Sequence, residues 1–168
     1  MCIRDGDGMR RVHWKMSAKR GELMVRLEEQ PWDPAMTIIV DTRVAAHIGS
    51  GPESTLEWVL SLGASLATEL LRDRLRVSLL GADGVIFRPI NGESTGAAAR
   101  LLATVTDVEP SGRAFLEDCL ADPDALGTAR TVVAGLGLLH SRDAAALVAA
   151  TARVADIDAL VPDARAFR

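Results

Sequence analysis

The sequence predicts an α/β fold in which helices cover both faces of a mainly parallel sheet. Short apolar runs alternate with longer segments of helical periodicity, turn residues separate them, and the first buried run ends in a carboxylate. The 168 residues are 48% hydrophobic and 25% charged, which fits one globular domain with a buried core. No apolar run reaches the roughly 18 residues that a membrane-spanning helix needs.

The first predicted elements are two strands separated by a proline-containing break. Residues 21–29 alternate partly between polar and apolar side chains, as in a half-buried strand. The break at 31–34 is the one candidate boundary, and it separates a segment at 1–30 from a domain at 35–168. The run that ends at Asp41 is continuous and apolar, which is typical of a buried parallel strand with functional residues at its carboxyl end.

A long helix and a hairpin follow. Ser54 and Glu57 form a capping box at the start of the helix, and apolar residues then recur at helical spacing over much of its surface. Strands are predicted at 76–81 and 85–90 with a tight turn between them. Pro89 places the second strand at a sheet edge, because proline donates no ladder hydrogen bond.

The second half of the chain predicts three helices and one buried strand, at 131–139. Ser94, Ser111 and Ser141 are each placed to cap a helix, since a serine hydroxyl can accept a hydrogen bond from a free backbone N–H. The predicted buried face of the last helix comprises Ala144, Leu147, Val148, Thr151, Ala152 and Ala155.

Charge is distributed unevenly along the chain, although the net charge is only −4. Residues 1–30 hold seven Lys and Arg against five Asp and Glu, and residues 31–168 hold 12 against 18. This acidic balance excludes a general attraction to nucleic acid or anionic lipid. The basic stretch at 10–20 offers only Trp14 for base stacking, so we interpret it as a structural clamp or a protein contact.

Two cysteines without a short motif favour a reducing, cytoplasmic compartment.

The most specific motif lies in the first 30 residues. Its members are Gly6, Asp7, Arg10, His13, Trp14, Ala18, Leu23, Val25 and Arg26. They resemble the signature of the bacterial domain of unknown function 58 family, with Lys19 where that family usually has Arg. The resemblance covers nearly the whole chain. It implies a von Willebrand factor type A-like, three-layer α/β domain with a mainly parallel sheet, preceded by the extended basic segment that holds the signature.

The resemblance also implies a member shortened at both ends. Relatives usually carry a membrane hairpin and a β-rich region before the signature, which here nearly adjoins Met1. A final strand is expected near 164–167, so we expect the last strand to be incomplete.

The segment after Asp41 bears on metal binding. Type A domains often bind Mg²⁺ through Asp-x-Ser-x-Ser with a distant Thr and Asp, but here Arg43 and Ala45 replace both serines. Gly135-Leu-Gly137 stands where the later Asp is expected, and Thr95 is a weak match to the Thr. We therefore expect a degenerate metal-ion-dependent adhesion site with no cofactor, and Mg²⁺ at Asp41 is the less favoured alternative. Arg43 either takes the place of the cation and pairs with Asp41, since i and i+2 share a face at a strand end, or points to water.

Other motifs are weaker. The two glycines at 135 and 137 lack the third glycine of a dinucleotide-binding fingerprint, and Ser65 lies inside a helix where no nucleophile elbow forms. The three histidines are far apart in sequence. His47 follows Asp41 in the loop where ligands bind in such sheets, so it is the histidine most suited to a function.

We therefore expect a non-enzymatic protein-interaction domain. The resemblance implies a MoxR-type AAA+ ATPase as partner, because relatives are often encoded beside one. The binding surface would be the loop rim that includes Asp41, Arg43 and His47, with a contribution from residues 10–20. The alternative, from another functional class, is a ligand-binding module of the adhesion type that depends on Mg²⁺.

Overall fold

The computed structural model describes residues 35–90, 96–121, 126, 128–152, 154 and 156–163. The signature residues and the strand predicted at 21–29 lie outside them, as do Ser94 and Thr95. The elements in chain order are β1 (Ala35–Val40), the short 3₁₀ helices η2 (Val44–Ala46) and η3 (Gly51–Glu53), α2 (Thr55–Arg72), β2 (Arg76–Gly81), β3 (Gly84–Phe87), α3 (Ala97–Thr106), α4 (Glu117–Ala121), β4 (Thr131–Gly135), α5 (Ser141–Thr151) and β5 (Asp156–Leu160).

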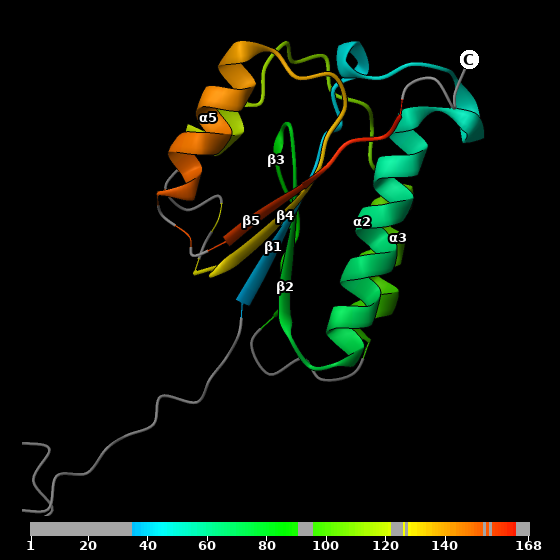
Figure 1. The fold of residues 1–168 in the computed structure, drawn as a ribbon. Coiled ribbons are helices and arrows are strands. Elements are labelled where there is room, and N and C mark those ends of the chain that lie inside the picture. The colour runs from blue at the N-terminus through cyan, green and yellow to red at the C-terminus, as the bar shows by residue number, and fades with distance from the viewer. Residues whose placement is uncertain are drawn as a thin grey trace, which may run out of the picture. The chain divides into compact units, whose positions relative to one another are not determined.

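The strands form one sheet in the order β3-β2-β1-β4-β5 (Figure 1). Strand β1 is parallel to β2 and to β4, β5 is parallel to β4, and β3 pairs antiparallel with β2. The predicted α/β fold with a mainly parallel sheet is therefore confirmed, and so is the edge position of the strand predicted at 85–90, although that strand ends at Phe87, before Pro89. The four parallel strands end on the same side of the sheet, which we call the carboxyl edge.

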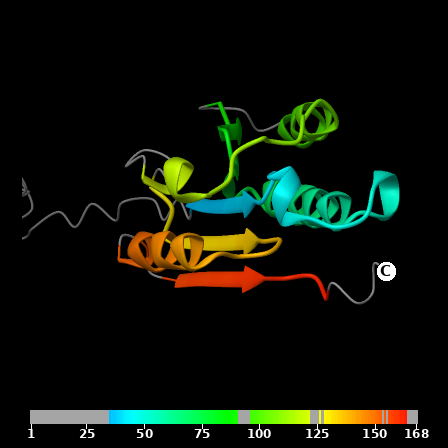
Figure 2. The same ribbon diagram turned by 90° about the horizontal axis from the view of Figure 1, so that it is seen from above.

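Helices cover both faces of this sheet and make three layers (Figure 2). The residues of β1 alternate between the layers, because successive side chains of a strand point to opposite faces. Ile38 and Val40 pack in a core cluster with residues of α2 and α3, whereas Ile39 packs with residues of α4 and α5. The central strand thus has both faces buried, as its continuous apolar run predicts.

Helix α2 begins as predicted and lies very close to β1. The Ser54 hydroxyl accepts a hydrogen bond of 3.2 Å from the backbone N–H of Glu57, which confirms the N-cap. A Cβ atom at Gly63 would lie 2.4 Å from Cγ1 of Val40, so the approach of the helix to the strand requires a glycine here.

The prediction that Ser111 caps a helix is wrong. Its backbone N–H donates to the carbonyl of Thr42 and its carbonyl accepts from the N–H of Val44, so Ser111 lies beside Arg43 in a parallel bridge. Helix α4 starts later, at Glu117.

The predicted boundaries of the last helix and its neighbouring strands also need correction. Strand β4 ends at Gly135 and not at residue 139, and His140 takes the N-cap position of α5 that we predicted for Ser141. A further strand, β5, pairs with β4 where we predicted no strand, and the final strand expected near 164–167 lies outside the described residues.

The buried face of α5 differs from the predicted one. Asp143, Leu147 and Ala150 are buried, but Val148 is 68% exposed and Ala144 is also exposed. Alanines lie on every side of this helix and leave its apolar stripe poorly defined, so periodicity alone predicts the wrong buried face. Among the described helices, none is both long enough and apolar enough to cross a membrane.

Candidate functional site

Arg43 lies at the carboxyl edge with its guanidinium fully inside the protein. The side chain is 1% exposed, although arginine is almost never buried without partners. It turns back onto Asp41, which follows β1 directly, and the Asp41–Arg43 pair predicted from the i, i+2 spacing is present. Nε donates to Oδ1 of Asp41 at 2.9 Å and Nη2 donates to Oδ2 at 2.7 Å, a bidentate arrangement.

The remaining hydrogen bonds of the guanidinium reach three other segments. Nη1 donates to Oδ2 of Asp143 at 2.9 Å and to the carbonyl of Ala114 at 3.0 Å, and Nη2 donates to the carbonyl of Leu138 at 3.3 Å. A guanidinium has five N–H donors. These contacts give each of them an acceptor, which offsets the large cost of removing the charge from water.

Both carboxylates receive further hydrogen bonds from the backbone. Asp41 accepts from the N–H of Arg43 at 3.1 Å and from the N–H of Gly137 at 3.2 Å. Asp143 accepts from the N–H groups of Leu116 at 2.7 Å and His140 at 3.0 Å. The buried ion network of Asp41, Arg43 and Asp143 is therefore fully satisfied, and in the described part of the chain no buried side-chain polar atom lacks a partner.

The network shifts the pKa values of Arg43 and Asp143 in the direction that favours their charged forms. The hydrogen bond to Asp41 raises the pKa of Arg43 against the opposing effect of burial. Burial raises the pKa of Asp143, but hydrogen bonds from Leu116, His140 and Arg43 outweigh it and hold that pKa below its ordinary value. Arg43 and Asp143 are therefore charged at neutral pH.

Asp143 is the member of the network that our sequence analysis missed. It belongs to α5, and it accepts a hydrogen bond from the backbone of the N-cap residue three positions earlier. An acidic residue at this position of a helix is a known capping signal, so the sequence contained a hint. That hint does not reveal that the same carboxylate also binds Arg43.

Gly137 allows the loop after β4 to approach the loop after β1. A Cβ atom at this position would lie 2.3 Å from the carbonyl oxygen of Ala46. The next residue, Leu138, donates its N–H to that same oxygen at 2.7 Å. A residue with a side chain at 137 would push the two loops apart and move the donor that binds Asp41.

His47 connects the end of β1 to the start of α2. Its Nε2 lies 2.7 Å from the carbonyl oxygen of Asp41, and its Nδ1 lies 3.0 Å from Oγ1 of Thr55. Since a carbonyl only accepts, Nε2 carries the hydrogen. Both ring nitrogens are therefore engaged within the protein, which points to a positioning role for this side chain.

Residues 3–157 match the family described as Protein of unknown function DUF58. The chain belongs to the DUF58 family. The match confirms the resemblance carried by the signature residues, and it extends from that segment into β5. Neither a curated protein nor a solved structure gives a significant match.

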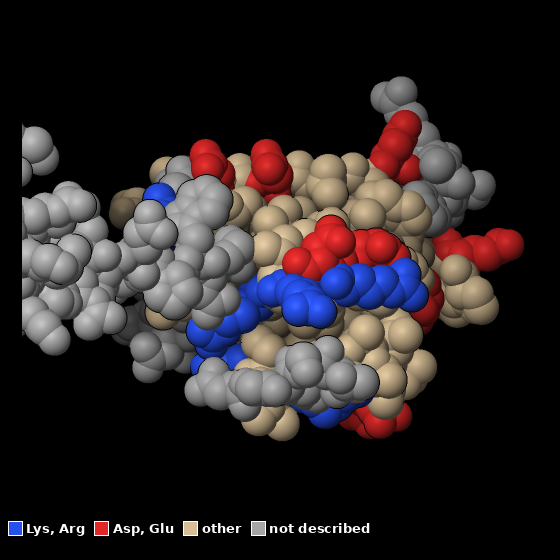
Figure 3. All heavy atoms as spheres, turned by 90° about the horizontal axis from the view of Figure 1, so that it is seen from below, with Lys and Arg blue, Asp and Glu red and all other residues tan. Residues whose placement is uncertain are grey.

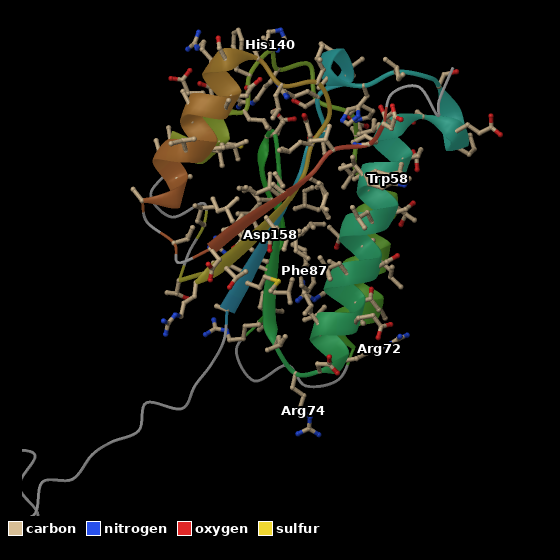
Figure 4. All side chains as sticks on the ribbon, viewed as in Figure 1. Trp58, Arg72, Arg74, Phe87, His140 and Asp158 are labelled. Atoms are coloured by element: carbon tan, nitrogen blue, oxygen red, sulfur yellow. The ribbon has the colours of Figure 1, made fainter. Side chains whose placement is uncertain are left out.

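The carboxyl edge of this DUF58 domain carries several exposed apolar side chains. Ten large apolar side chains are exposed in the described part of the chain. Six of the ten lie in the first turn of α2, at the last residue of β5, or in the segments that follow β1, β4 and β5, and they are Val44, Ile48, Trp58, Leu138, Leu160 and Val161. Figure 4 shows Trp58 near the same end of the molecule as His140. Large exposed apolar patches mark protein–protein or membrane interaction sites and ligand-binding grooves.

The residues after β1 do not fit the ligand set of Mg²⁺. Mg²⁺ prefers oxygen ligands in octahedral geometry, but both oxygens of Asp41 already accept N–H donors and position 43 supplies a cation. Position 45 is an alanine. No group of three or more His, Cys, Asp or Glu side chains among the described residues could hold a metal ion.

Proposed function

We propose that this DUF58 chain is a non-enzymatic protein-interaction domain that binds a MoxR-type AAA+ ATPase through the carboxyl edge of its sheet. The observation that carries the proposal is the concentration of exposed apolar side chains at that edge. Trp58 is among them, and tryptophan is one of the residues most enriched at the energetic centres of protein interfaces. The buried ion network beneath them gives the loops a fixed shape.

We further propose that the fold is von Willebrand factor type A-like with a degenerate metal site. Two features support the fold assignment. The central parallel strand β1 is followed directly by Asp41, and the long helix α2 comes next in the chain. The buried guanidinium of Arg43 supports the second part, because its positive charge lies against the carboxylate that would otherwise bind the cation. A surface of this kind binds a partner by shape and apolar contact without a bridging metal ion.

Binding to the ATPase can be measured directly with purified proteins. Each MoxR-type ATPase encoded in the source genome would be titrated against the immobilised chain, with ATP and Mg²⁺ present. Val44→Asp places a charge in the apolar cluster, and we expect it to weaken binding at least about tenfold, which corresponds to about 1.4 kcal/mol. Leu102→Asp on α3 is the matched control, because Leu102 is also exposed but lies outside the cluster.

Two outcomes would count against this proposal. Absence of binding to every such ATPase by the folded chain contradicts the choice of partner. Equal weakening by both variants contradicts the choice of surface. Asp41→Ala is unsuitable as a probe of the surface, because it would leave Arg43 buried without its main partner.

The metal-dependent alternative has its own test. Calorimetric titration of the unmodified chain with Mg²⁺ should give no binding at micromolar concentrations, and micromolar affinity would support the adhesion-type module instead. The variant with Arg43→Ser and Ala45→Ser restores the two hydroxyls. If this variant binds Mg²⁺ and the unmodified chain does not, the result supports the view that the Arg43 guanidinium takes the place of the metal ion.

A further inference from the structure

A pocket opens at the carboxyl edge beside the buried ion network. Its volume is about 250 Å³, and its lining includes Ala46, Ile48, Thr55, Leu138, Val161 and Pro162. The lining comes from four separate segments: the loop after β1, the start of α2, the loop after β4 and the residues after β5. The pocket lies among the exposed apolar side chains described above.

A hydrogen bond joins two of the lining segments, and most of the lining side chains are apolar. The N–H of Leu138 donates to the carbonyl of Ala46 at 2.7 Å, which holds the loop after β4 against the loop after β1. Ile48, Leu138 and Val161 form walls that are 39%, 66% and 58% exposed. Binding sites for small molecules usually measure about 300–1,000 Å³, so this pocket is better suited to one side chain of a larger partner.

Acidic residues are the only fully charged side chains in the described parts of the segments that line the pocket. Residues 44–57, 136–139 and 160–163 contain Glu53, Glu57 and Asp163, and they contain no Lys or Arg. All three acidic side chains are exposed. The opposite end of the sheet differs, because Figure 3 shows arginine side chains gathered there beside acidic ones. A cationic segment is therefore favoured at the pocket and an anionic one is disfavoured.

We propose that this pocket binds one large apolar side chain of the partner, from a segment that carries Lys or Arg next to that side chain. The inference rests on the proposed interaction function and specifies the chemistry that the carboxyl edge recognises. The apolar side chain supplies the affinity by leaving water, and the basic neighbours select orientation and partner through the acidic side chains of the lining segments.

A displayed library of random 12-residue peptides, selected on the folded chain, provides the probe. We expect enrichment of peptides with one aromatic or large aliphatic residue flanked by Lys or Arg. Synthetic copies of the enriched peptides should shift the NMR signals of Ile48, Leu138 and Val161 when added to the ¹⁵N-labelled chain. Because the peptides are selected without an ATPase, this result does not depend on the identity of the natural partner.

Four variants test the location of the site. Leu138→Gln should lower the affinity for the enriched peptides at least about tenfold, and Glu53→Lys should lower it several-fold, with a smaller effect at high salt. Val148→Gln and Asp73→Lys are the controls, and we expect less than about a twofold change. Val148 matches Leu138 in exposure, and Asp73 lies at the far end of α2 from Glu53.

Several results would overturn the inference. The first is that the same peptides are enriched equally on the native chain and on the Leu138→Gln variant. The second is a peptide consensus without basic residues, and the third is a set of peptide-induced NMR shifts that lie outside the pocket. An ATPase that binds the native chain and Leu138→Gln equally would also reject the pocket while leaving the interaction function intact. Peptide binding at the pocket without any ATPase binding would retain the pocket and reject the ATPase.

Discussion

Oδ2 of Asp143 lies 2.9 Å from Nη1 of Arg43, although 100 positions separate the two residues in the sequence. This contact connects the end of the central strand β1 to the first turn of α5, which packs in another layer. It also gives the second carboxylate of the network its cationic partner. An ion pair thus joins the sheet to α5 at this point, whereas apolar side chains make other contacts between these two layers.

Replacement of Arg43 should be strongly destabilising. Arg43→Met preserves much of the side-chain volume but leaves two buried carboxylates without their cation. We expect the free energy of unfolding to fall by about 3–5 kcal/mol, measured by urea denaturation. Arg72→Ala is the control, because its ion pair with Glu69 is exposed and should contribute less than about 1 kcal/mol. Similar losses of unfolding free energy in both variants would show that the buried network stabilises the protein no more than an exposed ion pair does.

The stability of the domain should depend on pH through Asp143. The pKa of Asp143 in the folded state is lower than the ordinary value of 3.8, which applies to the unfolded chain. The unfolded chain therefore binds a proton at this carboxylate more readily than the folded chain does. The stabilisation is fully present above that ordinary value and is lost as the pH falls through the folded pKa. A ¹³C NMR titration of the side-chain carboxyl carbon checks this directly, and a midpoint at or above 3.8 would contradict it. Asp143→Asn serves to assign the signal.

Addition of one methyl group at position 137 should weaken the carboxyl edge. In Gly137→Ala the new Cβ meets the carbonyl oxygen of Ala46, so the loops must separate. Overpacking of this kind costs about 1–3 kcal/mol of unfolding free energy. Gly112→Ala provides the matched control, since a Cβ there meets nothing within 4 Å. Equal unfolding midpoints for the two variants would indicate that the loop approach is not required.

Cys119 should react slowly with thiol reagents while the protein is folded. The side chain is 7% exposed, and burial raises the pKa of its thiol from 9.0 to about 11, so the reactive thiolate is scarce at pH 8. Cys2→Ser leaves Cys119 as the one remaining cysteine. Iodoacetamide labelling of that variant, followed by mass spectrometry, should accelerate sharply in urea. Rapid labelling without denaturant would contradict the buried placement.

Local patterns were sufficient to predict much of the fold. The apolar run before Asp41, the cap at Ser54 and the edge position of β3 each depend on residues close together in sequence. The pairing of Arg43 with Asp41 belongs to this group, because two residues along a strand return to the same face. Such features can be predicted because the chain makes the contact with its own neighbours.

Features that depend on distant segments could not be predicted in the same way. Ser111 looks like a helix cap, but its backbone pairs beside Arg43, and no local pattern encodes that bridge. Asp143 looks like an exposed residue of an alanine-rich helix, but a guanidinium from another layer accounts for its burial. The pocket at the carboxyl edge was likewise not anticipated, because its lining combines four segments that only the folded sheet brings together.

The position of β1 at the centre of the sheet has a consequence for synthesis of the protein. One neighbour, β2, leaves the ribosome soon after β1, but Met36 pairs on its other side with Thr131. At about 5–20 residues per second, roughly 5–20 s pass between the translation of Arg43 and that of Asp143. During this interval the nascent chain exposes one side of its central strand together with an arginine that has only part of its network. We therefore expect the partly made chain to be a substrate for chaperones until α5 has been translated.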